Sequence, residues 1–262
     1  MRLPIYQVDA FADAVFGGNP AAVCPLGQWL PDETLQRIAA ENNLSETAFL
    51  VARDAAAGEY ELRWFTPGAE VDLCGHATLA SAHVLFERLT PGLGTLRFHT
   101  RSGPLTVMRE GARLVKEFPA RPPKPWDDGG AVAAALGVVP LEVWAAEKAL
   151  ALLPDEAAVK AVLPDMARVA GLPKDGLIVT APGRAHDFVS RYFAPHVDIP
   201  EDPVTGSAHC VLAPFWAARL NQTELRARQV SRRGGEVACR LDGERVFLSG
   251  QAVAYMEGTI TL

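Results

Sequence analysis

The pattern of apolar and polar positions predicts short strands in the first third of the chain. Runs rich in aromatic and β-branched residues cover positions 5–11, 46–52 and 60–66. A helix is predicted from Pro31 to about Glu41, because Asp32 and Glu33 fall in its first turn, where the helix dipole favours carboxylates. A second helix, 75–89, is apolar around nearly its whole circumference, which predicts that it lies inside the protein.

The rest of the chain alternates between predicted helices and strands. The proline- and glycine-rich stretch 119–130 is the best candidate for a linker. After it the pattern predicts a short helix, strands near 143–153, 176–181 and 187–194, and helices over 155–170 and 206–220, the last kinked at Pro214. The final segment predicts β-hairpins with turns at Asp242-Gly243 and Glu257-Gly258.

The two halves of the chain repeat one local pattern. The segment from Arg63 to Pro67 (RWFTP) is matched by the segment from Arg191 to Pro195 (RYFAP), and each precedes a loop and an apolar helix that opens with glycine. The repeats lie about 130 residues apart, so we infer two similar lobes whose helix N-termini point at a shared cleft. A chance similarity of two strand–helix units is the alternative.

Composition excludes several classes of protein. With 49% hydrophobic residues and a formal charge of −6, the 262-residue chain is predicted to be a compact globule, and it lacks the basic face of a nucleic-acid binder. No apolar run approaches the roughly 20 residues of a membrane-spanning helix. The four cysteines are scattered without a Cys-x-x-Cys pair, which predicts neither a disulfide framework nor a zinc site and favours a reducing, cytoplasmic location.

The two glycine-led helix starts are the first candidate binding features. A helix N-terminus exposes unpaired N–H groups and a positive dipole, so Gly75 and Gly206 are predicted to seat a carboxylate or phosphate. Glu46 begins a predicted strand among apolar residues, where it is either a desolvated general base or a solvated strand-end carboxylate. Asp202 precedes Pro203 and either orients a substrate group or forms an ordinary turn.

Two further candidates flank Gly75. His76 is expected to have its pKa lowered by the positive helix end, so that a neutral imidazole can shuttle protons. Cys74 is expected either to have its thiol pKa lowered by the same helix or to be a small buried hydrophobe. No nucleotide loop or acyl-serine motif is present, and the remaining histidines show no metal spacing.

The motifs together resemble the PhzF family of phenazine-biosynthesis-like isomerases. They lie in order along nearly the whole chain, at Gln7–Phe11, Gly18–Val23, Asn43–Phe49, Phe65–Pro67, Leu73–Thr78, Glu201–His209 and Ser231–Gly235. The resemblance implies an α+β, diaminopimelate-epimerase-like fold, with two pseudo-symmetric lobes that are each a mixed β-barrel-like sheet around a central helix. It also implies a homodimer. We place the N-terminal lobe at 1–118, completed by a last strand at about 252–262, and the C-terminal lobe at 119–251.

The same resemblance implies roles for the candidate residues. Glu46 looks like the family's general acid/base, with His76, Asp202 and Ser207 as polar residues around the substrate. The amides of Gly75 and Gly206 resemble a carboxylate-binding pair. In racemases of this fold two thiols face the substrate; here Cys74 corresponds to the first and Thr205 to the second.

These expectations lead to one hypothesis with two alternatives. The chain is expected to be a cofactor-independent isomerase that moves a proton within a small carboxylated metabolite, which is amino- or hydroxy-substituted or cyclic, through Glu46. No metal, nucleic-acid or membrane partner is expected. The alternatives are a racemase, epimerase or dehydratase that uses Cys74, and a catalytically silent metabolite-binding protein of the same fold.

Overall fold

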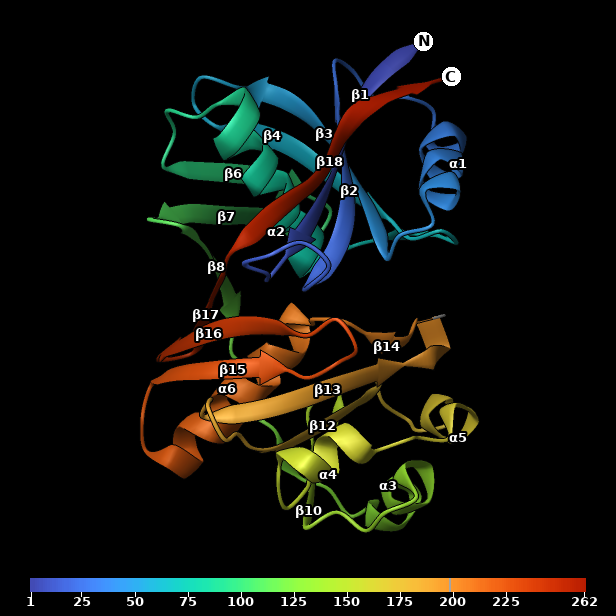
Figure 1. Cartoon of the computed structure of the whole chain (residues 1–262), viewed down its shortest axis with the longest axis vertical. Coiled ribbons are helices and arrows are strands. Elements are labelled where there is room, and N and C mark those ends of the chain that lie inside the picture. Colours follow the sequence, from blue (N-terminus) through green and yellow to red (C-terminus); the bar gives the residue numbers. More distant parts are fainter. Residues whose placement is uncertain (198) are drawn as a thin grey trace. The chain divides into compact units, whose positions relative to one another are not determined.

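A computed structural model describes residues 1–197 and 199–262, which form two compact units (Figure 1). The N-terminal unit comprises Met1–Glu117 together with Ser249–Leu262, and the C-terminal unit comprises Phe118–Leu248. The C-terminal strand therefore returns to the unit in which the chain begins.

The N-terminal unit is built on strands that alternate between parallel and antiparallel pairing. These strands are β1 (Arg2–Ala10), β2 (Asn19–Leu26), β3 (Glu46–Asp54), β4 (Glu59–Phe65), β5 (Glu70–Val71), β6 (Thr95–Thr100), β7 (Gly103–Glu110), β8 (Arg113–Pro119) and β18 (Ala252–Thr261). Strand β1 pairs antiparallel with both β18 and β2. Along the chain, β2 and β3 are parallel, β3 and β4 antiparallel, β4 and β6 parallel, and β6 and β7 antiparallel.

Two helices complete this unit. Helix α1 (Asp32–Asn42) turns Leu35, Ile38 and Ala39 inward, as its predicted first turn and periodicity require. Helix α2 (Gly75–Val84), extended by a π-helical turn over Leu85–Leu89, packs against β1, β2, β3 and β18. Nearly all of its side chains are buried, which confirms that an apolar circumference indicates an internal helix.

The C-terminal unit repeats the same pairing order. Strands β11 (Ala149–Leu152) and β12 (Leu177–Pro182) are parallel, and β12 and β13 (Phe188–Ala194) are antiparallel. Strand β13 is parallel to β15 (Glu224–Gln229), which is antiparallel to β16 (Gly235–Asp242). The buried helix α6 (Gly206–Leu220) lies between β13 and β15 in the chain, just as α2 lies between β4 and β6. This shared order supports the inferred duplication over chance similarity.

The remaining elements of the C-terminal unit lie around these strands. They are β9 (Lys124–Pro125), α3 (Gly129–Leu136), β10 (Glu142–Ala145), α4 (Glu156–Ala161), α5 (Met166–Ala170), a 3-10 turn (Pro195–Val197), β14 (Ile199–Asp202) and β17 (Arg245–Gly250). Helices α3, α4 and α5 bury Val132, Val159 and Val169 against the apolar side chains of β11, β12 and β13.

An arginine–glutamate fork recurs in each unit and extends the duplication to side chains. Arg63 on β4 binds Glu70 on β5 through two hydrogen bonds of 2.7 and 2.8 Å, and Arg191 on β13 binds Glu201 on β14 at 2.7 and 3.0 Å. Each guanidinium also stacks on an aromatic ring of its own strand, Phe65 or Phe193. The forks fasten the loops that lead into α2 and α6, and thereby position both helix starts.

Two predicted segments differ in the structure. The proline-rich stretch 119–130 is not a free linker: β9 pairs with β10, Trp126 packs on the core, and Gly129 begins α3. The helix predicted over 155–170 is divided into α4 and α5 around Pro164, which cannot donate the backbone hydrogen bond that a continuous helix needs. In contrast, α6 continues through Pro214.

The predicted turn at Glu257-Gly258 is also wrong. Both residues lie inside β18, where Gly258 stands opposite Ile5 of β1. Pairing with the first strand over most of its length holds this segment extended, and that partner lies too far away in sequence for a local turn signal to reveal it.

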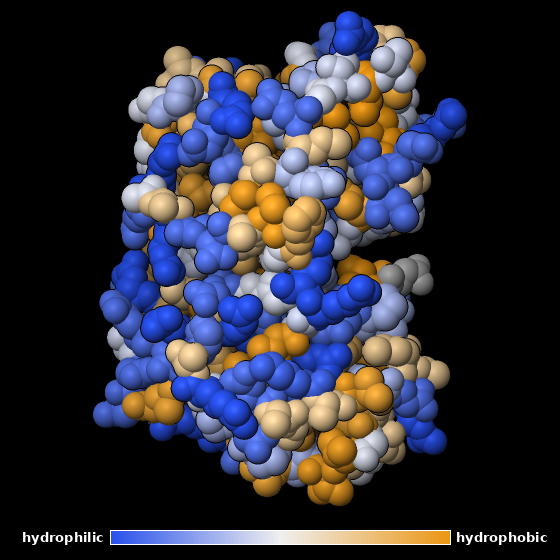
Figure 2. Space-filling model, in the orientation of Figure 1, coloured by the Kyte–Doolittle hydropathy of each residue, from blue (hydrophilic) through white to orange (hydrophobic). Residues whose placement is uncertain are grey.

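The visible surface is largely hydrophilic, with an apolar group over β18 (Figure 2). Tyr255 and Met256 of this strand are exposed, and Tyr255 contacts the ring of Phe16 edge-on. Among the described residues, none of the helices has the length and apolar character needed to cross a membrane.

Candidate functional site

Glu46 begins strand β3 and lies in the interior of the N-terminal unit. Its backbone is in register with Ala21 of the parallel strand β2, and the residue is only 8% exposed. Asn43, in the left-handed conformation, ends α1 three residues earlier and turns the chain toward the strand. The solvated strand-end alternative for Glu46 is therefore wrong, because the fold places the carboxylate among buried groups.

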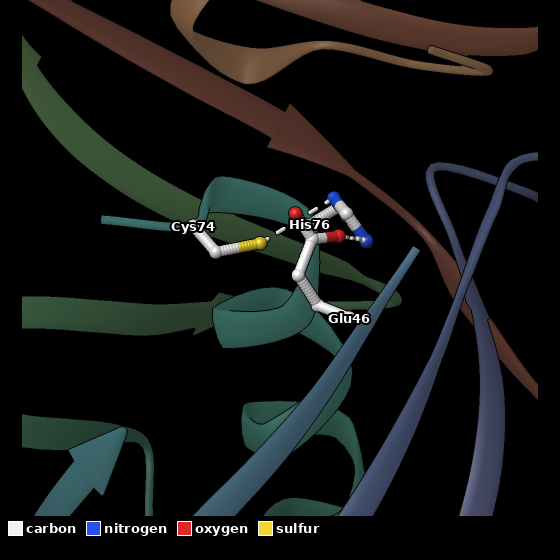
Figure 3. A group of neighbouring side chains, drawn as sticks. All are labelled: Glu46, Cys74 and His76. Carbon is white, nitrogen blue, oxygen red and sulfur yellow. Dashed lines mark hydrogen bonds and ion pairs between the residues drawn. The ribbon is translucent and has the colours of Figure 1, made fainter. Parts of the chain in front are cut away.

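The start of α2 brings Cys74 and His76 to this carboxylate. His76 Nε2 lies 3.0 Å from Glu46 Oε2, and Cys74 Sγ lies 3.6 Å from the other ring nitrogen, Nδ1 (Figure 3). All three side chains are buried. The structure thus assembles the predicted Glu46, Cys74 and His76 into one cluster, in which the imidazole lies between a carboxylate and a thiol.

Asn19 is a member of this cluster that the sequence analysis did not identify. Its Nδ2 donates to His76 Nδ1 across 3.2 Å, and the residue is fully buried. An amide N–H can donate only to an unprotonated Nδ1, so Asn19 favours the ring with its proton on Nε2, facing Glu46. Position 19 lies in the Gly18–Val23 motif, to which we assigned no role in the site.

The pKa directions at this cluster correct the prediction for His76 and decide between the two alternatives for Cys74 in favour of a buried thiol. Burial acts to lower the pKa of His76, but Cys74 and Glu46 outweigh it and hold that pKa well above its usual range. Burial raises the pKa of the Cys74 thiol, the Glu46 carboxylate raises it further, and His76 lowers it only in part. The predicted lower pKa values relied on the helix dipole, which is outweighed at His76 by Cys74 and Glu46 and at Cys74 by burial and the Glu46 carboxylate.

Two buried atoms of the cluster lack an aligned partner. Although Glu46 Oε2 and His76 Nε2 are close, neither makes a regularly directed hydrogen bond within the described part of the chain. Buried polar atoms are rarely left in this state, and such atoms are concentrated at functional sites. The carboxylate oxygen and the ring nitrogen are thus available to an incoming polar group.

The same cluster is the one group of potential metal donors found among the described residues. The donor atoms of Glu46, Cys74 and His76 lie within 4.8 Å of one another, and a thiolate with an imidazole suits zinc-like cations. However, Nδ1 of the ring faces the thiol and Nε2 faces the carboxylate. A metal ion placed between the three side chains binds one ring nitrogen, so it can use only one of these two contacts. The geometry fits proton exchange across the ring better than metal ligation.

A second group of predicted residues lies in the C-terminal unit. Thr205 precedes α6, and its hydroxyl donates to Asp202 Oδ2 across 2.5 Å. Gln229 of β15 accepts from the Thr205 amide at 2.9 Å and donates to the Asp202 carbonyl at 2.6 Å. Gln229 was missed, although a polar residue at an inward position of an alternating strand was a usable signal.

The starts of both buried helices lack side-chain caps. Neither Cys74 before α2 nor Thr205 before α6 caps its helix, whereas Asp155 and Asp165 cap α4 and α5. Thr205 is a residue type that caps well, but its hydroxyl is directed to Asp202 instead. The first amides of α2 and α6, which include those of Gly75, Gly206 and Ser207, are therefore free of a competing side-chain acceptor.

His209, in the first turns of α6, makes folding stability depend on pH. Its Nδ1 donates to the Thr205 carbonyl, and burial lowers its pKa to about 4. The unfolded chain takes up this proton near pH 6.5 and the folded chain only near pH 4, so stability falls as the pH drops through that interval. We expect this residue to reduce the unfolding free energy by about 2 kcal/mol between pH 7 and pH 5.

Urea unfolding of wild type and His209→Gln at both pH values measures this contribution. The substitution should flatten the pH dependence by that amount, whereas substitution of the exposed His196 by Gln should leave it unchanged. Equal slopes in wild type and His209→Gln would show that the buried ring does not resist protonation.

Comparison with known proteins places this chain among close relatives. It is 55% identical over the full length of both chains to a Pseudomonas aeruginosa protein named as an uncharacterized isomerase. A crystal structure of a PhzF-family phenazine biosynthesis protein from Enterococcus faecalis covers both chains completely, with 46% identity and a TM-score of 0.97. A hydroxyproline epimerase from Agrobacterium vitis, at 10% identity and a TM-score of 0.61 over 99% of this chain and 92% of that one, shares the fold alone.

These likenesses confirm the predicted diaminopimelate-epimerase-like fold and the resemblance noted from the motifs. The family model for the phenazine biosynthesis-like proteins matches residues 8–258. The match spans both units and includes Glu46, Cys74, His76, Asp202 and Thr205. This chain therefore belongs to the PhzC–PhzF family of phenazine biosynthesis-like proteins.

Proposed function

We propose that this protein is a cofactor-independent isomerase that moves a proton within a small carboxylated metabolite, with Glu46 as the general acid/base. The substrate is an amino- or hydroxy-substituted acid, cyclic or open, whose migrating proton is made acidic by a neighbouring unsaturated or carboxyl group. Close relatives are named as isomerases, in keeping with this class of reaction.

The observation that carries the proposal is the buried, unaligned pair of Glu46 Oε2 and His76 Nε2. A carboxylate held in the interior without a directed partner has its lone pairs available for a substrate proton. Because one carboxylate can remove a proton from one carbon and return it to a neighbouring carbon on the same face, a single base suffices for the shift. His76 stabilises the carboxylate before the proton arrives.

The uncapped helix starts support the proposal that the substrate carries a carboxylate. The amides at Gly75, Gly206 and Ser207 offer N–H donors and a positive helix end, which together favour an anion. Asp202, held by Thr205 and Gln229, has the acceptor chemistry that suits a hydroxyl or amino substituent.

Deuterium exchange tests the proposal even while the substrate is unidentified. The purified protein is incubated in D₂O with a panel of cyclic and open amino and hydroxy acids, including unsaturated ones, and proton NMR follows both solvent deuterium uptake and positional isomers. We expect at least one unsaturated carboxylic acid to convert to an isomer with its double bond displaced.

The other outcomes of the panel have distinct meanings. Exchange confined to the α-carbon of saturated amino acids, and abolished by Cys74→Ala, would replace the isomerase with the epimerase alternative. Compounds that bind, as shown by ligand-observed NMR, but neither exchange nor convert would indicate the catalytically silent binding protein.

A further inference from the structure

The thiol of Cys74 has no task in a reaction carried by one carboxylate, yet it contacts the same imidazole as that carboxylate. Its Sγ lies 3.6 Å from His76 Nδ1, while Glu46 Oε2 lies 3.0 Å from His76 Nε2 (Figure 3). Because the two nitrogens belong to one conjugated ring, a proton accepted at one of them allows a proton to leave from the other. The imidazole therefore connects the thiol with the carboxylate.

We propose that Cys74 is a proton-storing partner of Glu46, connected to it through the ring of His76. This inference rests on the proposed function, in which Glu46 carries the migrating proton. Cys74 acts through His76 and is a positioning residue for that proton, distinct from the thiol bases of the epimerase alternative.

The transfer involves two protons and no change in any bond between heavy atoms. The resting state from which the transfer starts has Glu46 as a carboxylate, Cys74 as a thiol and the His76 proton on Nε2, because Asn19 donates to Nδ1. The raised pKa of His76 favours uptake of the thiol proton by the ring. The thiol proton moves to Nδ1 while the Nε2 proton moves to Glu46 Oε2, which gives a thiolate, the other imidazole tautomer and a carboxylic acid. The total charge and the number of protons are unchanged, and the reverse transfer restores the resting state.

Two features of the cluster indicate that the thiol holds the proton at rest. Asn19 donates to His76 Nδ1 and so favours an unprotonated Nδ1. Burial and the Glu46 carboxylate both raise the pKa of the Cys74 thiol. The loaded state is then a minor one in the free protein. Substrate binding that engages Glu46, or turns the ring into alignment with it, increases the population of that state, since catalytic hydrogen bonds often align only in the complex.

The proton held by Cys74 allows Glu46 to start the reaction in two ways. Glu46 can be loaded with a proton from inside the site, so that turnover begins either by removing a proton from the substrate or by adding one. When turnover begins from the loaded state, Glu46 adds its stored hydrogen to the substrate and then removes the migrating one. The reverse transfer moves that migrating hydrogen to His76 Nε2, so the product no longer carries it, which gives the relay a measurable consequence.

Serine and alanine variants of Cys74 separate a relay from a simple hydrogen bond. Serine keeps a donor to His76 Nδ1 but does not give up its proton near neutral pH, whereas alanine removes both functions. Cys24→Ser is the matched control, because this buried thiol of β2 is in the same unit and packs in the apolar core beside Ala22 and Phe49.

The first test needs no substrate. In protein labelled with ¹⁵N-histidine, the Nδ1 resonance of His76 should lie closer to the protonated position in wild type and Cys24→Ser than in Cys74→Ser. Glu46→Gln should match Cys74→Ser, because its amide accepts no proton and the transfer needs both ends. Coincident Nδ1 resonances in wild type and Cys74→Ser over the pH range of the folded state would overturn the relay.

The second test uses a substrate found in the D₂O panel, deuterated at the migrating position and converted in H₂O. Wild type should lose part of the deuterium to solvent, whereas Cys74→Ser and Cys74→Ala should both retain more of it in the product. Equal retention in all variants, or retention restored to the wild-type level by serine alone, would reduce Cys74 to a structural role. Failure of every panel compound to convert contradicts the proposed function, while the ¹⁵N comparison decides the relay independently.

Discussion

Replacement of Glu46 by Gln should reduce turnover by about 10³-fold while the fold and ligand binding persist. Glutamine has the same shape and still occupies the buried position at the start of β3, but it cannot accept or return a proton. The loss should therefore appear in kcat, with KM changed much less. The measurement is the initial rate at saturating concentration of the compound that wild type converts in the D₂O panel.

A matched control separates chemistry from a general effect of the substitution. Glu33→Gln makes the same change on the exposed first turn of α1, in the same unit, and should keep the wild-type rate. Thermal unfolding of both variants verifies that they are folded. If Glu46→Gln retains more than about a tenth of wild-type kcat, a loss far smaller than general acid/base catalysis provides, another group carries the proton.

Replacement of Arg191 by Ala should destabilise the protein by about 3 kcal/mol. Its guanidinium makes the two bonds to Glu201, donates to the Val162 carbonyl at 2.7 Å and stacks on Phe193. Removal leaves a partly buried carboxylate and a carbonyl oxygen without their donor, and such losses dominate the cost of breaking a buried ion pair. Arg191→Lys should recover only part of the loss, because an ammonium group lacks the planar fork.

The duplicated fork supplies both a repeat of this experiment and a control. Arg63→Ala, at the corresponding place on β4, should behave similarly, since its contacts with Glu70 and Phe65 match those of Arg191. Arg168→Ala removes an exposed ion pair with Asp165 and should cost less than about 1 kcal/mol. Urea unfolding of all three gives the comparison, and equal stabilities for Arg191→Ala and Arg168→Ala would refute the structural role of the fork.

The repeated fork also shows how far local sequence can lead. The RWFTP and RYFAP segments revealed the duplication because each is a strand with a fixed spacing to an apolar, glycine-led helix. The partners of the two arginines were not evident. Glu70 and Glu201 lie seven and ten residues farther along, and only the pairing of β4 with β5 and of β13 with β14 brings them to the guanidinium groups.

The sequence by itself determined many of the elements, the duplication, the buried character of α2 and α6 and the candidates Glu46, Cys74 and His76. These properties depend on periodicity and on residues that are close in the chain. Only the tertiary structure decided that Asn19 contacts His76, that Gln229 holds Asp202 and Thr205, and that β18 pairs with β1. It also reversed the expected pKa shift of His76 and decided between the two alternatives for Cys74. A pKa depends on burial and on charges a few ångströms away in space, and folding brings together groups that are distant in the chain.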